Sequence, residues 1–496
     1  MLTLINTNTM KPAIAPVGLD YIAGAAKEAG IEVDLVDLCL SGDPDATLRD
    51  YFSKNNPELI GLSFRNVDDC FWPSCQWFVP RLAGLVQSIR RLTEAPIVIG
   101  GVGFSIFAKQ IVLYSGADFG IHGDGEQATV SLYSELLRDR RFDKVPGLVW
   151  RQDGQFITND VFWCEPLALV GDRDAVDNAT YFRLGGQLGV ETKRGCSRNC
   201  IYCADRLSKG TLLRVRKPAE VADEVETLLA KGIDMLHICD SEFNVARNHA
   251  YAVCEEFVRR GFGSRLKWYT YMAVVPFDAE LAAIMRKAGC VGIDFTGDSA
   301  SEKMLGVYHQ QHSREDLAVA VRLCRENDIT VMIDLLLGGP GETPATVKET
   351  IDFVKQINPD CAGAPLGVRI YPGTDMAITT AAEGPMEANP NIKRKYEGPV
   401  DLFRPTFYIS HLLGERPARL VKDLIAGDKR FFEPINEADA IATDHNYNDN
   451  TELVNAIKSG ARGAYWHILH KLRGGAVHKP FKINAADRNR PHLDFS

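Results

Sequence analysis

The stretch TKRGCSRNCIYCADRLSKG, residues 192–210, holds three cysteines in a C-x3-C-x2-C spacing, with an aromatic residue just before the last. Zinc sites usually add a second pair of ligands further along the chain, and disulfide scaffolds need an even number of cysteines. A four-iron cluster normally takes four cysteines, so three would leave one iron open to a ligand. The spacing therefore favours an iron–sulfur cluster held by Cys196, Cys200 and Cys203. A zinc site completed by a remote residue such as Cys239, or three unligated cysteines, remains the alternative.

The cysteines follow the first of six predicted strands that alternate with helical segments. The strands are predicted at 188–192, 235–239, 266–271, 291–296, 330–337 and 366–371. The helix after the cysteines is well marked, since Pro218 suits its first turn and Gly232 suits its end. This repeated strand–helix spacing predicts a partial (β/α)6 barrel of the TIM type. The cysteines would then lie at the carboxyl ends of the strands, where barrel active sites are built.

The first part of the chain predicts a second α/β unit. Short apolar runs at 2–6, 31–37, 59–64, 96–100 and 118–121 alternate with amphipathic segments such as 17–28 and 128–137. The alternation predicts a Rossmann-like parallel sheet with helices on both faces. Glycines gather at two predicted strand ends, in IGGVGF (99–104) and IHGDGE (121–126), where ligands of open parallel sheets bind. No G-x-G-x-x-G joins the first strand to the first helix, so a dinucleotide site is not predicted.

These patterns divide the chain into four parts. Residues 1–145 form the Rossmann-like domain, and 146–185 form a connector that begins with a hairpin, PGLVWRQDGQFITND (146–160), around Asp153 and Gly154. Residues 186–385 form the barrel. The remainder, 386–496, mixes proline-rich loops with helical patches and is predicted to cap the substrate side of the barrel.

Composition limits the classes of partner. The 496-residue chain carries a net charge of −9 without a long basic run, which argues against nucleic acid and favours a small-molecule substrate. No stretch of 18 apolar residues could span a bilayer, and the start lacks the pattern of a secretory signal. Nine of the 12 cysteines are scattered, as expected for a reducing, cytoplasmic setting.

The C-x3-C-x-aromatic-C motif after the first strand of a partial barrel resembles the radical S-adenosylmethionine (SAM) superfamily. The resemblance covers residues 188–375. It implies that Cys196, Cys200 and Cys203 hold a 4Fe-4S cluster whose open iron binds SAM, and that a donor such as flavodoxin or ferredoxin supplies electrons. Tyr202 would border the adenine of SAM.

The same resemblance suggests further SAM contacts at the later strand ends. In HICDSEFN (237–244), Asp240 and Glu242 would accept hydrogen bonds from the ammonium group. In FTGDSAS (295–301), Asp298 and Ser299 would bind the ribose, and Arg369 in VRIYPGTDM (368–376) would point at the pocket. The alternative is that these residues only form turns and helix caps.

The front domain resembles the cobalamin-binding class of that superfamily, through the loops GLSFRNVDD (61–69), VIGGVGFS (98–105) and GIHGDGE (120–126). These loops give the candidate cofactor-binding residues Arg65, Asn66, Gly100, Gly101, Gly103, Gly123, Gly125 and Glu126. The D-x-H-x-x-G motif is absent, and His122 is the only histidine before the cysteines. Arg65 resembles the arginine that lies under cobalt in the tryptophan 2-C-methyltransferase branch. A salt bridge from Arg65 to Asp68 or Asp69 is the alternative.

The leading functional hypothesis is cobalamin-dependent methyl transfer to a small, natural-product-type or modified amino-acid substrate. A second enzymatic hypothesis is transfer of the 3-amino-3-carboxypropyl group of SAM, without cobalamin, to a soft acceptor such as an arsenical near Cys70 and Cys75. A third hypothesis is a non-catalytic cobalamin or iron–sulfur sensor, although the tail shows no signalling module. In that tail, His445, Tyr447 and Trp466 either line the pocket or belong to the core.

Overall fold

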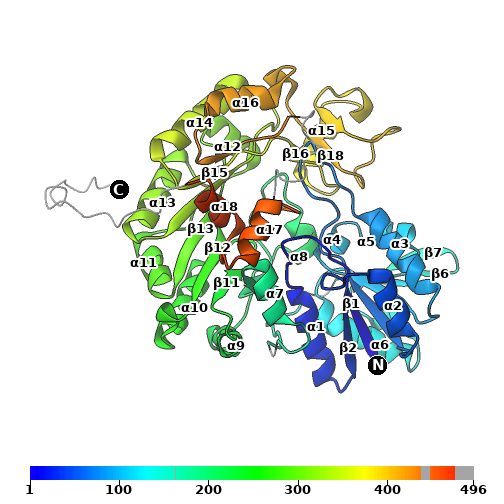
Figure 1. Ribbon diagram of the computed structural model, residues 1–496. Helices are drawn as coiled ribbons and strands as arrows, with labels where there is room; N and C mark the ends of the chain where they lie inside the picture. The colour runs from blue at the N-terminus through cyan, green and yellow to red at the C-terminus, as the bar shows by residue number, and fades with distance from the viewer. Residues whose placement is uncertain (162, 172, 437–446, 475–496) are drawn as a thin grey trace.

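The computed structural model describes residues 1–161, 163–171, 173–436 and 447–474. Two α/β bodies lie side by side in Figure 1, the front domain on the right and the barrel on the left. The first body is a seven-stranded sheet of order β2-β1-β3-β4-β5-β6-β7. Its parallel strands are β1 (Leu2–Asn6), β2 (Val33–Asp37), β3 (Leu59–Ser63), β4 (Ile97–Gly100) and β5 (Phe119–Ile121). The predicted Rossmann-like sheet is confirmed.

Helices cover both faces of this sheet, as the buried, apolar strands require. The helices are α1 (Val17–Glu28), α2 (Pro44–Phe52), α3 (Val79–Arg90), α4 (Val102–Ile106), α5 (Ala108–Ser115) and α6 (Gly125–Leu136). Helices α1 and α6 share one apolar cluster, and α2, α3 and α5 share another on the opposite face. The carboxyl ends of β1, β3 and β4 stay free for loops that contact the barrel.

The predicted hairpin is present as β6 (Leu148–Gln152) and β7 (Gln155–Thr158). Asp153 and Gly154 both have positive φ, 51° and 80°, as a two-residue hairpin turn requires. Because β6 pairs antiparallel with β5, this hairpin forms the edge of the first sheet.

The second body is an open sheet of seven parallel strands. In sheet order they are β19 (Phe431–Phe432), β15 (Cys361–Gly363), β14 (Thr330–Leu335), β13 (Cys290–Asp298), β12 (Lys267–Ala273), β11 (Met235–Ile238) and β8 (Leu188–Val190). The outer helices are α9 (Pro218–Ala230), α10 (Arg247–Arg259), α11 (Ala279–Lys287), α12 (Glu302–Tyr308), α13 (Arg314–Glu326) and α14 (Pro344–Ile357). Strands β8 and β19 remain edges, so the barrel is partial, as predicted.

The predicted sixth strand, 366–371, is wrong. The sixth barrel strand is β15, and β16 (Val368–Arg369) pairs instead in a small antiparallel sheet with β18 (Thr406–Tyr408) and β17 (Ile392–Arg394). The small residues of β15 give little apolar signal, whereas the alternating Val368 and Ile370 resemble a strand more strongly. The sequence therefore contains a strand at both places, and only packing decides which one joins the barrel.

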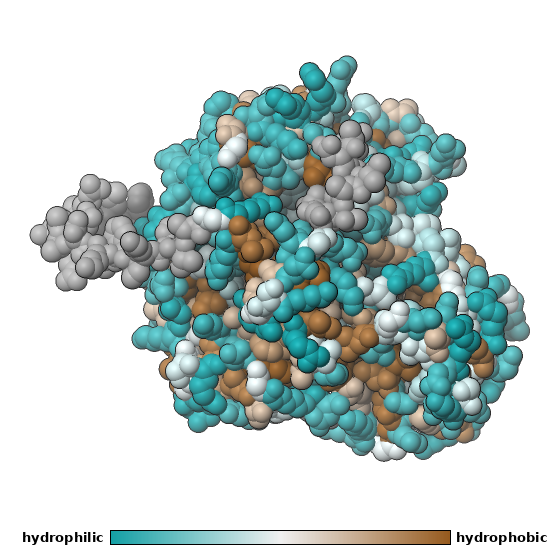
Figure 2. Space-filling view, in the orientation of Figure 1, coloured by the Kyte–Doolittle hydropathy of each residue, from teal (hydrophilic) through white to brown (hydrophobic). Residues whose placement is uncertain are grey.

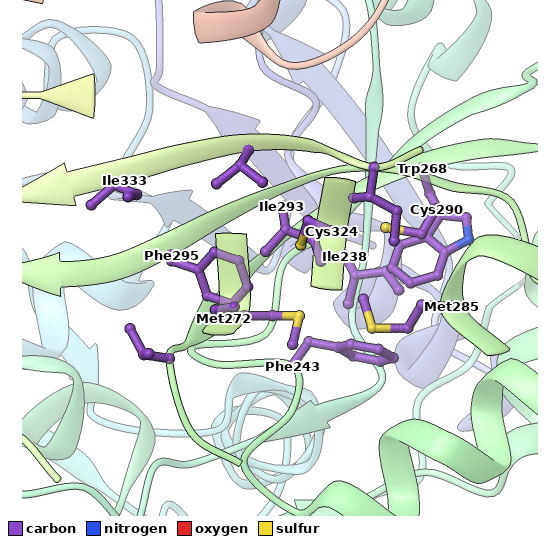
Figure 3. Close-up of a cluster of buried hydrophobic side chains, with 14 of the residues drawn as sticks. Ile238, Phe243, Trp268, Met272, Met285, Cys290, Ile293, Phe295, Cys324 and Ile333 are labelled. Atoms are coloured by element: carbon purple, nitrogen blue, oxygen red, sulfur yellow. The ribbon is translucent and has the colours of Figure 1, made fainter. Parts of the chain in front are cut away.

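Alternate side chains of the barrel strands point outward and inward. Figure 3 shows the outward set packed together with residues of the surrounding helices, and its labelled members include Ile238, Trp268, Met272, Ile293, Phe295 and Ile333. The residues between them, among them His237, Tyr271, Asp294 and Asp334, therefore face the concave interior of the barrel, which we call the lumen.

The segment predicted as a substrate-side cap lies at both ends of the barrel. Val368, Ile370 and Tyr408 of the small sheet pack with Ile201 of the cysteine loop. Helix α17 (Thr451–Lys458) contacts α7 (Asn178–Gly185), and α18 (Tyr465–Leu472) contacts β15. Near the strand starts, Trp466 packs edge-on against Tyr269 with ring centroids 5.9 Å apart, so Trp466 is a core residue. His445 lies outside the described residues.

Buried ion pairs join the two bodies. Arg173 pairs with Asp20 of α1 at 3.3 Å and with Glu224 of α9 at 2.6 Å, and all three side chains are fully buried. Removing one partner would leave an uncompensated buried charge and destabilise the protein. The three residues therefore fix the contact between the two bodies.

The face drawn in Figure 2 is mostly hydrophilic, with hydrophobic residues in scattered patches. Among the described residues, no helix is both long and apolar enough to cross a bilayer.

Candidate functional site

The cysteine loop begins at β9 (Lys193–Arg194) and returns at β10 (Arg214–Val215), which pairs with β9. The amide of Cys196 donates to the carbonyl of Gly210 at 3.1 Å. Gly195 has φ of 86°, and a Cβ at this position would lie 1.9 Å from the Leu212 carbonyl oxygen. Only glycine fits there, and the tight closure holds Cys196 against the base of the loop.

The three cysteines lie near one another, with Cys196 buried and Cys200 and Cys203 partly buried. Burial raises the pKa of Cys200 to about 12 and raises the pKa values of Cys196 and Cys203 as well. Cys196 and Cys200 are among the groups that raise the pKa of Cys203, so the thiols feel one another's charge. Thiols in such surroundings become thiolates when a metal supplies positive charge. The loop therefore fits a metal centre.

The donor set fits a cluster better than a single ion. In the described part of the chain, no three His, Cys, Asp or Glu side chains converge closely enough to hold one metal ion. A cluster does not need such convergence, because each thiolate binds a different iron. Cys239, the proposed fourth zinc ligand, has Glu191, Asp240, Arg65 and Arg173 as its electrostatic neighbours. The alternative of a zinc site is not supported.

Beside the cysteines, two opposite charges are buried without a hydrogen-bond partner among the described residues. They are the Nζ of Lys193, whose residue is 1% exposed, and the Oε2 of Glu242. The other oxygen of Glu242 accepts a hydrogen bond from Thr296 Oγ1 at 2.8 Å. Burial raises the pKa of Glu242 to about 7, and Lys193 acts in the opposite direction. Buried charges are normally paired, so a ligand with one ammonium and one carboxylate would satisfy both.

The methionine end of SAM is such a ligand. Both Glu242 and Lys193 act on the pKa of Cys196, so the unpaired charges lie on the cysteine side of the lumen. Lys193 was missed by sequence reasoning, although its place between the first strand and the cysteines is a usable signal. Glu242 lies on the cysteine side of the lumen, and its contact with SAM stays a prediction.

Asp240 has a different position from the one predicted. Its carboxylate accepts hydrogen bonds from the Thr192 amide at 2.8 Å, the Thr192 hydroxyl at 2.5 Å and the Lys193 amide at 3.2 Å. These bonds occupy the carboxylate and fix the segment that leads into the cysteine loop. Asp240 is therefore a positioning residue in this structure.

Tyr202 and Asp298 are brought together with the cysteines. The Tyr202 hydroxyl donates to Asp298 Oδ2 at 2.7 Å, and Gln310 Nε2 lies 3.4 Å from the Cys200 sulfur. Burial raises the pKa of Asp298 to about 7. Ser299 is turned away, since its hydroxyl bonds Thr350 Oγ1 of α14 at 2.8 Å. The pair Tyr202–Asp298 can thus meet a ligand in the lumen, whereas the placement of Ser299 does not support a contact with ribose.

Arg369 does not point at the SAM pocket. Its Nε donates to Asp68 Oδ2 at 2.9 Å and its Nη2 donates to the Leu402 carbonyl at 3.1 Å, with both charged side chains almost fully buried. The prediction fails because β16 belongs to the small antiparallel sheet and not to the barrel. The alternation of inward and outward side chains along the barrel strands therefore does not apply to Arg369. Arg369 joins that sheet to the front domain.

Arg65 lies at a cavity of about 220 Å³ beyond the carboxyl ends of β1 and β3. Asn66, Thr7, Met10 and Phe78 also line the cavity, and no histidine does so in the described part of the chain. Ligands of open parallel sheets bind at this end. The cavity, with Arg65 at its edge, fits the place where a cobalamin-type ligand would meet the front domain.

Arg65 forms no ion pair within the residues that the structure describes. Asp68, its predicted partner in the alternative reading, pairs with Arg369, and Asp69 Oδ1 accepts from the amides of Phe71 and Gln76. Burial lowers the pKa of His237 to about 4, and the charge of Arg65 adds to that effect. Because His237 faces the lumen from β11, the guanidinium of Arg65 lies between the front domain and the barrel.

The glycines after β4 position this arginine. Gly101 has φ of 114°, and its added Cβ would lie 2.7 Å from the Phe64 carbonyl oxygen. A Cβ on Gly103 would lie 2.9 Å from the carbonyl oxygen of Arg65. Gly100 is less restricted, since its nearest contact would be 3.9 Å away. The loop after β4 therefore packs directly against the backbone that carries Arg65 and Asn66.

Replacing Gly101 by alanine is expected to destabilise the front domain by about 1–3 kcal/mol, because a side chain at this φ is strained and meets the Phe64 carbonyl. Gly18→Ala is the matched control, since Gly18 lies in α1 with nothing near its added Cβ; it is expected to be neutral or slightly stabilising. Urea unfolding of the two variants measures the difference. Equal stabilities would contradict the proposed contact.

The second glycine loop joins the two bodies. Gly123 has φ of 93°, and its Cβ would lie 2.6 Å from the Val161 side chain, while that of Gly125 would lie 3.2 Å from Ile22. Glu126 pairs with Arg194 of β9 at 2.8 Å; the arginine lowers the pKa of this carboxyl although burial alone would raise it. These residues anchor the cysteine loop to the front domain, and their predicted role as cofactor contacts is not supported by this placement.

Cys70 and Cys75 both have positive φ, 49° and 56°. Cys75 packs against the barrel core, and burial raises its pKa to about 12, so it is a thiol at neutral pH. Soft acceptors are bound by thiolates. Cys70 is exposed, and its pKa is likewise raised to about 12. The packing of Cys75 and the raised pKa values of both thiols do not favour a site for an arsenical.

Comparison with known proteins supports both the cysteine loop in the barrel and the cavity of the front domain as cofactor sites. The family model of the radical SAM superfamily matches residues 190–354, and that of the B12 binding domain matches residues 4–132. The chain is 28% identical to the tryptophan 2-C-methyltransferase of Streptomyces laurentii, over 93% of this chain and 94% of that protein.

Two solved structures are similar over nearly the whole chain. The radical SAM methyltransferase TsrM from Kitasatospora setae, with its tryptophan substrate and a SAM analogue bound, has a TM-score of 0.88 and 30% identity, and the match covers 95% of this chain and 99% of that one. The same enzyme with cobalamin and a [4Fe-4S] cluster also has a TM-score of 0.88, with 28% identity and coverage of 95% and 98%.

Proposed function

Because the chain belongs to the cobalamin-dependent radical SAM methyltransferases, we propose that it transfers the methyl group of SAM to carbon 2 of tryptophan or of a closely related indole amino acid. The predicted family, the methyl-transfer reaction and the cofactor set of 4Fe-4S cluster, SAM and cobalamin are confirmed at this level. The proposal of an indole substrate is supported by one observation: this chain is similar, over nearly its whole length, to an enzyme whose structure holds tryptophan.

The residues of this chain divide the work between its two bodies. Cys196, Cys200 and Cys203 would hold the cluster, and Lys193 with Glu242 would orient the methionine end of SAM. The cluster and cobalamin, when bound, supply the redox and methyl-carrying chemistry, and the protein positions them and excludes water. The division into residues 1–145 for cobalamin and 186–385 for the cluster is part of this proposal.

Arg65 would control the cobalt face that meets the front domain. In a cavity without a lining histidine among the described residues, an unpaired guanidinium offers no lone pair to a metal. A cation there also disfavours other ligands that would approach the same face. Reducing power would come from a flavodoxin or ferredoxin, and a reducing cytoplasm would suit an iron–sulfur cluster.

Cofactor content and the by-product of SAM test this function together. The full chain is reconstituted anaerobically with iron, sulfide and hydroxocobalamin and then supplied with SAM, L-tryptophan and a reductant. We expect about four irons per chain, retained cobalamin, and methyltryptophan formed with equimolar S-adenosylhomocysteine. Methylthioadenosine instead of S-adenosylhomocysteine would show aminocarboxypropyl transfer and overturn the proposal. If protein loaded with cluster and cobalamin did not turn over SAM at all, the hypothesis of a non-catalytic cobalamin or iron–sulfur sensor would be favoured.

Removing either unpaired charge beside the cysteines is expected to weaken SAM binding about tenfold or more, because a hydrogen bond between charged groups is lost. The variants are Glu242→Gln and Lys193→Met, and the dissociation constant is measured by calorimetry on the reconstituted protein. Glu226→Gln, on the outer surface of α9, is the control and should bind SAM as the wild type does. Unchanged affinity in both lumen variants would show that these charges serve another ligand.

A further inference from the structure

Two carboxyl groups in the middle of the lumen have no counter-charge. Asp294 is the fifth residue of β13 and Asp334 is the fifth residue of β14, and the two strands are neighbours in the sheet. Their sequence neighbours Ile293, Phe295 and Ile333 point outward into the core shown in Figure 3. Asp294 and Asp334 therefore project into the lumen from adjacent strands.

Asp294 is an unsatisfied buried acid. Its residue is 5% exposed, and its Oδ1 has no hydrogen-bond partner among the described residues. In that same part of the chain, neither Asp294 nor Asp334 forms an ion pair with a Lys, Arg or His. Buried carboxyl groups normally have a basic or hydrogen-bonding partner, because an isolated buried charge is costly. The partner is thus expected to arrive with a ligand.

In the described part of the chain, no cation is among the groups that act on the pKa values of Asp294 and Asp334. Burial and the neighbouring charges of Asp334 and Glu242 raise the pKa of Asp294 well above its ordinary value. The phenols of Tyr271 and Tyr447 lie near the pair, since both carboxyls raise their pKa values. On β15, Gly363 leaves room, because a Cβ there would lie 2.4 Å from Asp334 Oδ1. The surroundings are two carboxyls, two phenols, a glycine and the ring of His237, which lies 4.8 Å from that of Tyr271. Because the pKa of His237 is lowered to about 4, its ring is neutral at pH 7, and the site can receive a cation with several N–H donors.

The pair lies deeper in the lumen than the charges that suit SAM, although Glu242 is near enough to act on Asp294. Asp294 precedes Asp298, the last residue of β13, by four positions, so it lies about 13 Å deeper along the strand. The SAM pair Lys193–Glu242 lies on the cysteine side instead. Arg65 acts on both His237 and Tyr271, which places the cavity of the front domain beside the same part of the lumen.

We propose that Asp294 and Asp334 bind the cationic amino group of the methyl acceptor and so select amines over uncharged or anionic analogues. The inference rests on the proposed function, since it concerns the substrate of that same site. Both residues are positioning and specificity residues: they hold the acceptor by its ammonium group, three N–H donors shared between two carboxylates, while the ring of the acceptor lies toward Arg65.

Three acceptors test the inference with the reconstituted full chain: L-tryptophan, tryptamine, which keeps only the ammonium group, and indole-3-propionate, which keeps only the carboxylate. The wild type is expected to prefer tryptophan and tryptamine over indole-3-propionate by about tenfold to a hundredfold in kcat/KM. In Asp294→Asn and Asp334→Asn, the KM for tryptophan should rise by a similar factor with little change in kcat. The same variants should methylate indole-3-propionate at least as well as the wild type.

Two controls keep the result interpretable. Asp352→Asn removes an exposed carboxylate on the outside of α14 and should leave all three substrates unaffected. The lumen variants should bind SAM normally and melt at or above the temperature of the wild type, because an unpaired buried acid is removed. A fall in kcat without a change in KM, or an equal loss for all three acceptors, would overturn the inference. If fully loaded wild type methylates no indole, the proposed function fails and the inference fails with it.

Discussion

Replacing Cys203 by alanine is expected to remove the iron–sulfur cluster and to abolish methyl transfer. The residue lies in the loop between β9 and β10 that brings the three cysteines together. A cluster with only two protein thiolates keeps too few ligands to stay bound. Iron and sulfide analysis after anaerobic reconstitution should give nearly four irons per wild-type chain and close to none in the variant, and Cys196→Ala and Cys200→Ala should behave alike.

Cys164 provides the matched control. It is a free, partly exposed cysteine outside the loop, and Cys164→Ala should retain the full iron content and activity. Cobalamin retention in the Cys203 variant should also remain, because the front domain has its own core. Full iron content in the three loop variants would contradict the assignment of the cluster.

Removing the charge of Arg65 is expected to slow methyl transfer about tenfold to a hundredfold, comparable to the loss of a residue that orients a metal's ligands. Arg65→Gln takes away the cation but keeps a polar side chain, whereas Arg65→Lys keeps the cation at the same cavity edge. We therefore expect the lysine variant to keep much more activity than the glutamine variant. The electronic spectrum of bound cobalamin should report an additional ligand on cobalt in Arg65→Gln and none in Arg65→Lys.

The two variants separate charge from shape. Both leave Asp68 paired with Arg369, so the contact between the front domain and the small sheet is unaffected. If Arg65→Gln matched the wild type in rate and spectrum, Arg65 would have no part in controlling the cobalt face.

The sequence alone predicted the features that follow from local pattern. The apolar runs placed β1 and the other strands of the first sheet, and the spacing of the cysteines placed the metal site in the right loop. Helix α1 was predicted at its observed bounds, 17–28. These features depend on residues close together in the chain, which periodicity can show.

Features that depend on distant contacts could not be predicted. Arg369 was assigned to the SAM pocket because β16 looks like a barrel strand, but its true partner is Asp68, 301 residues away. Ser299 and Asp240 have the right residue types at strand ends, yet Thr350 and Thr192 take up their polar groups. The place of Lys193 before the cysteines is visible in the sequence, but that Lys193 and Asp294 are buried without partners among the described residues is known only from the structure.

The most direct test of the central claim follows the methyl group itself. Fully loaded enzyme is given SAM with a carbon-13 methyl group, together with L-tryptophan and a reductant, and is compared with the same preparation lacking cobalamin. We predict that the label appears at carbon 2 of the indole in the nuclear magnetic resonance spectrum, with equimolar S-adenosylhomocysteine, and only when cobalamin is present. Label transfer that continues without cobalamin, or label found only in methylthioadenosine, would contradict the account.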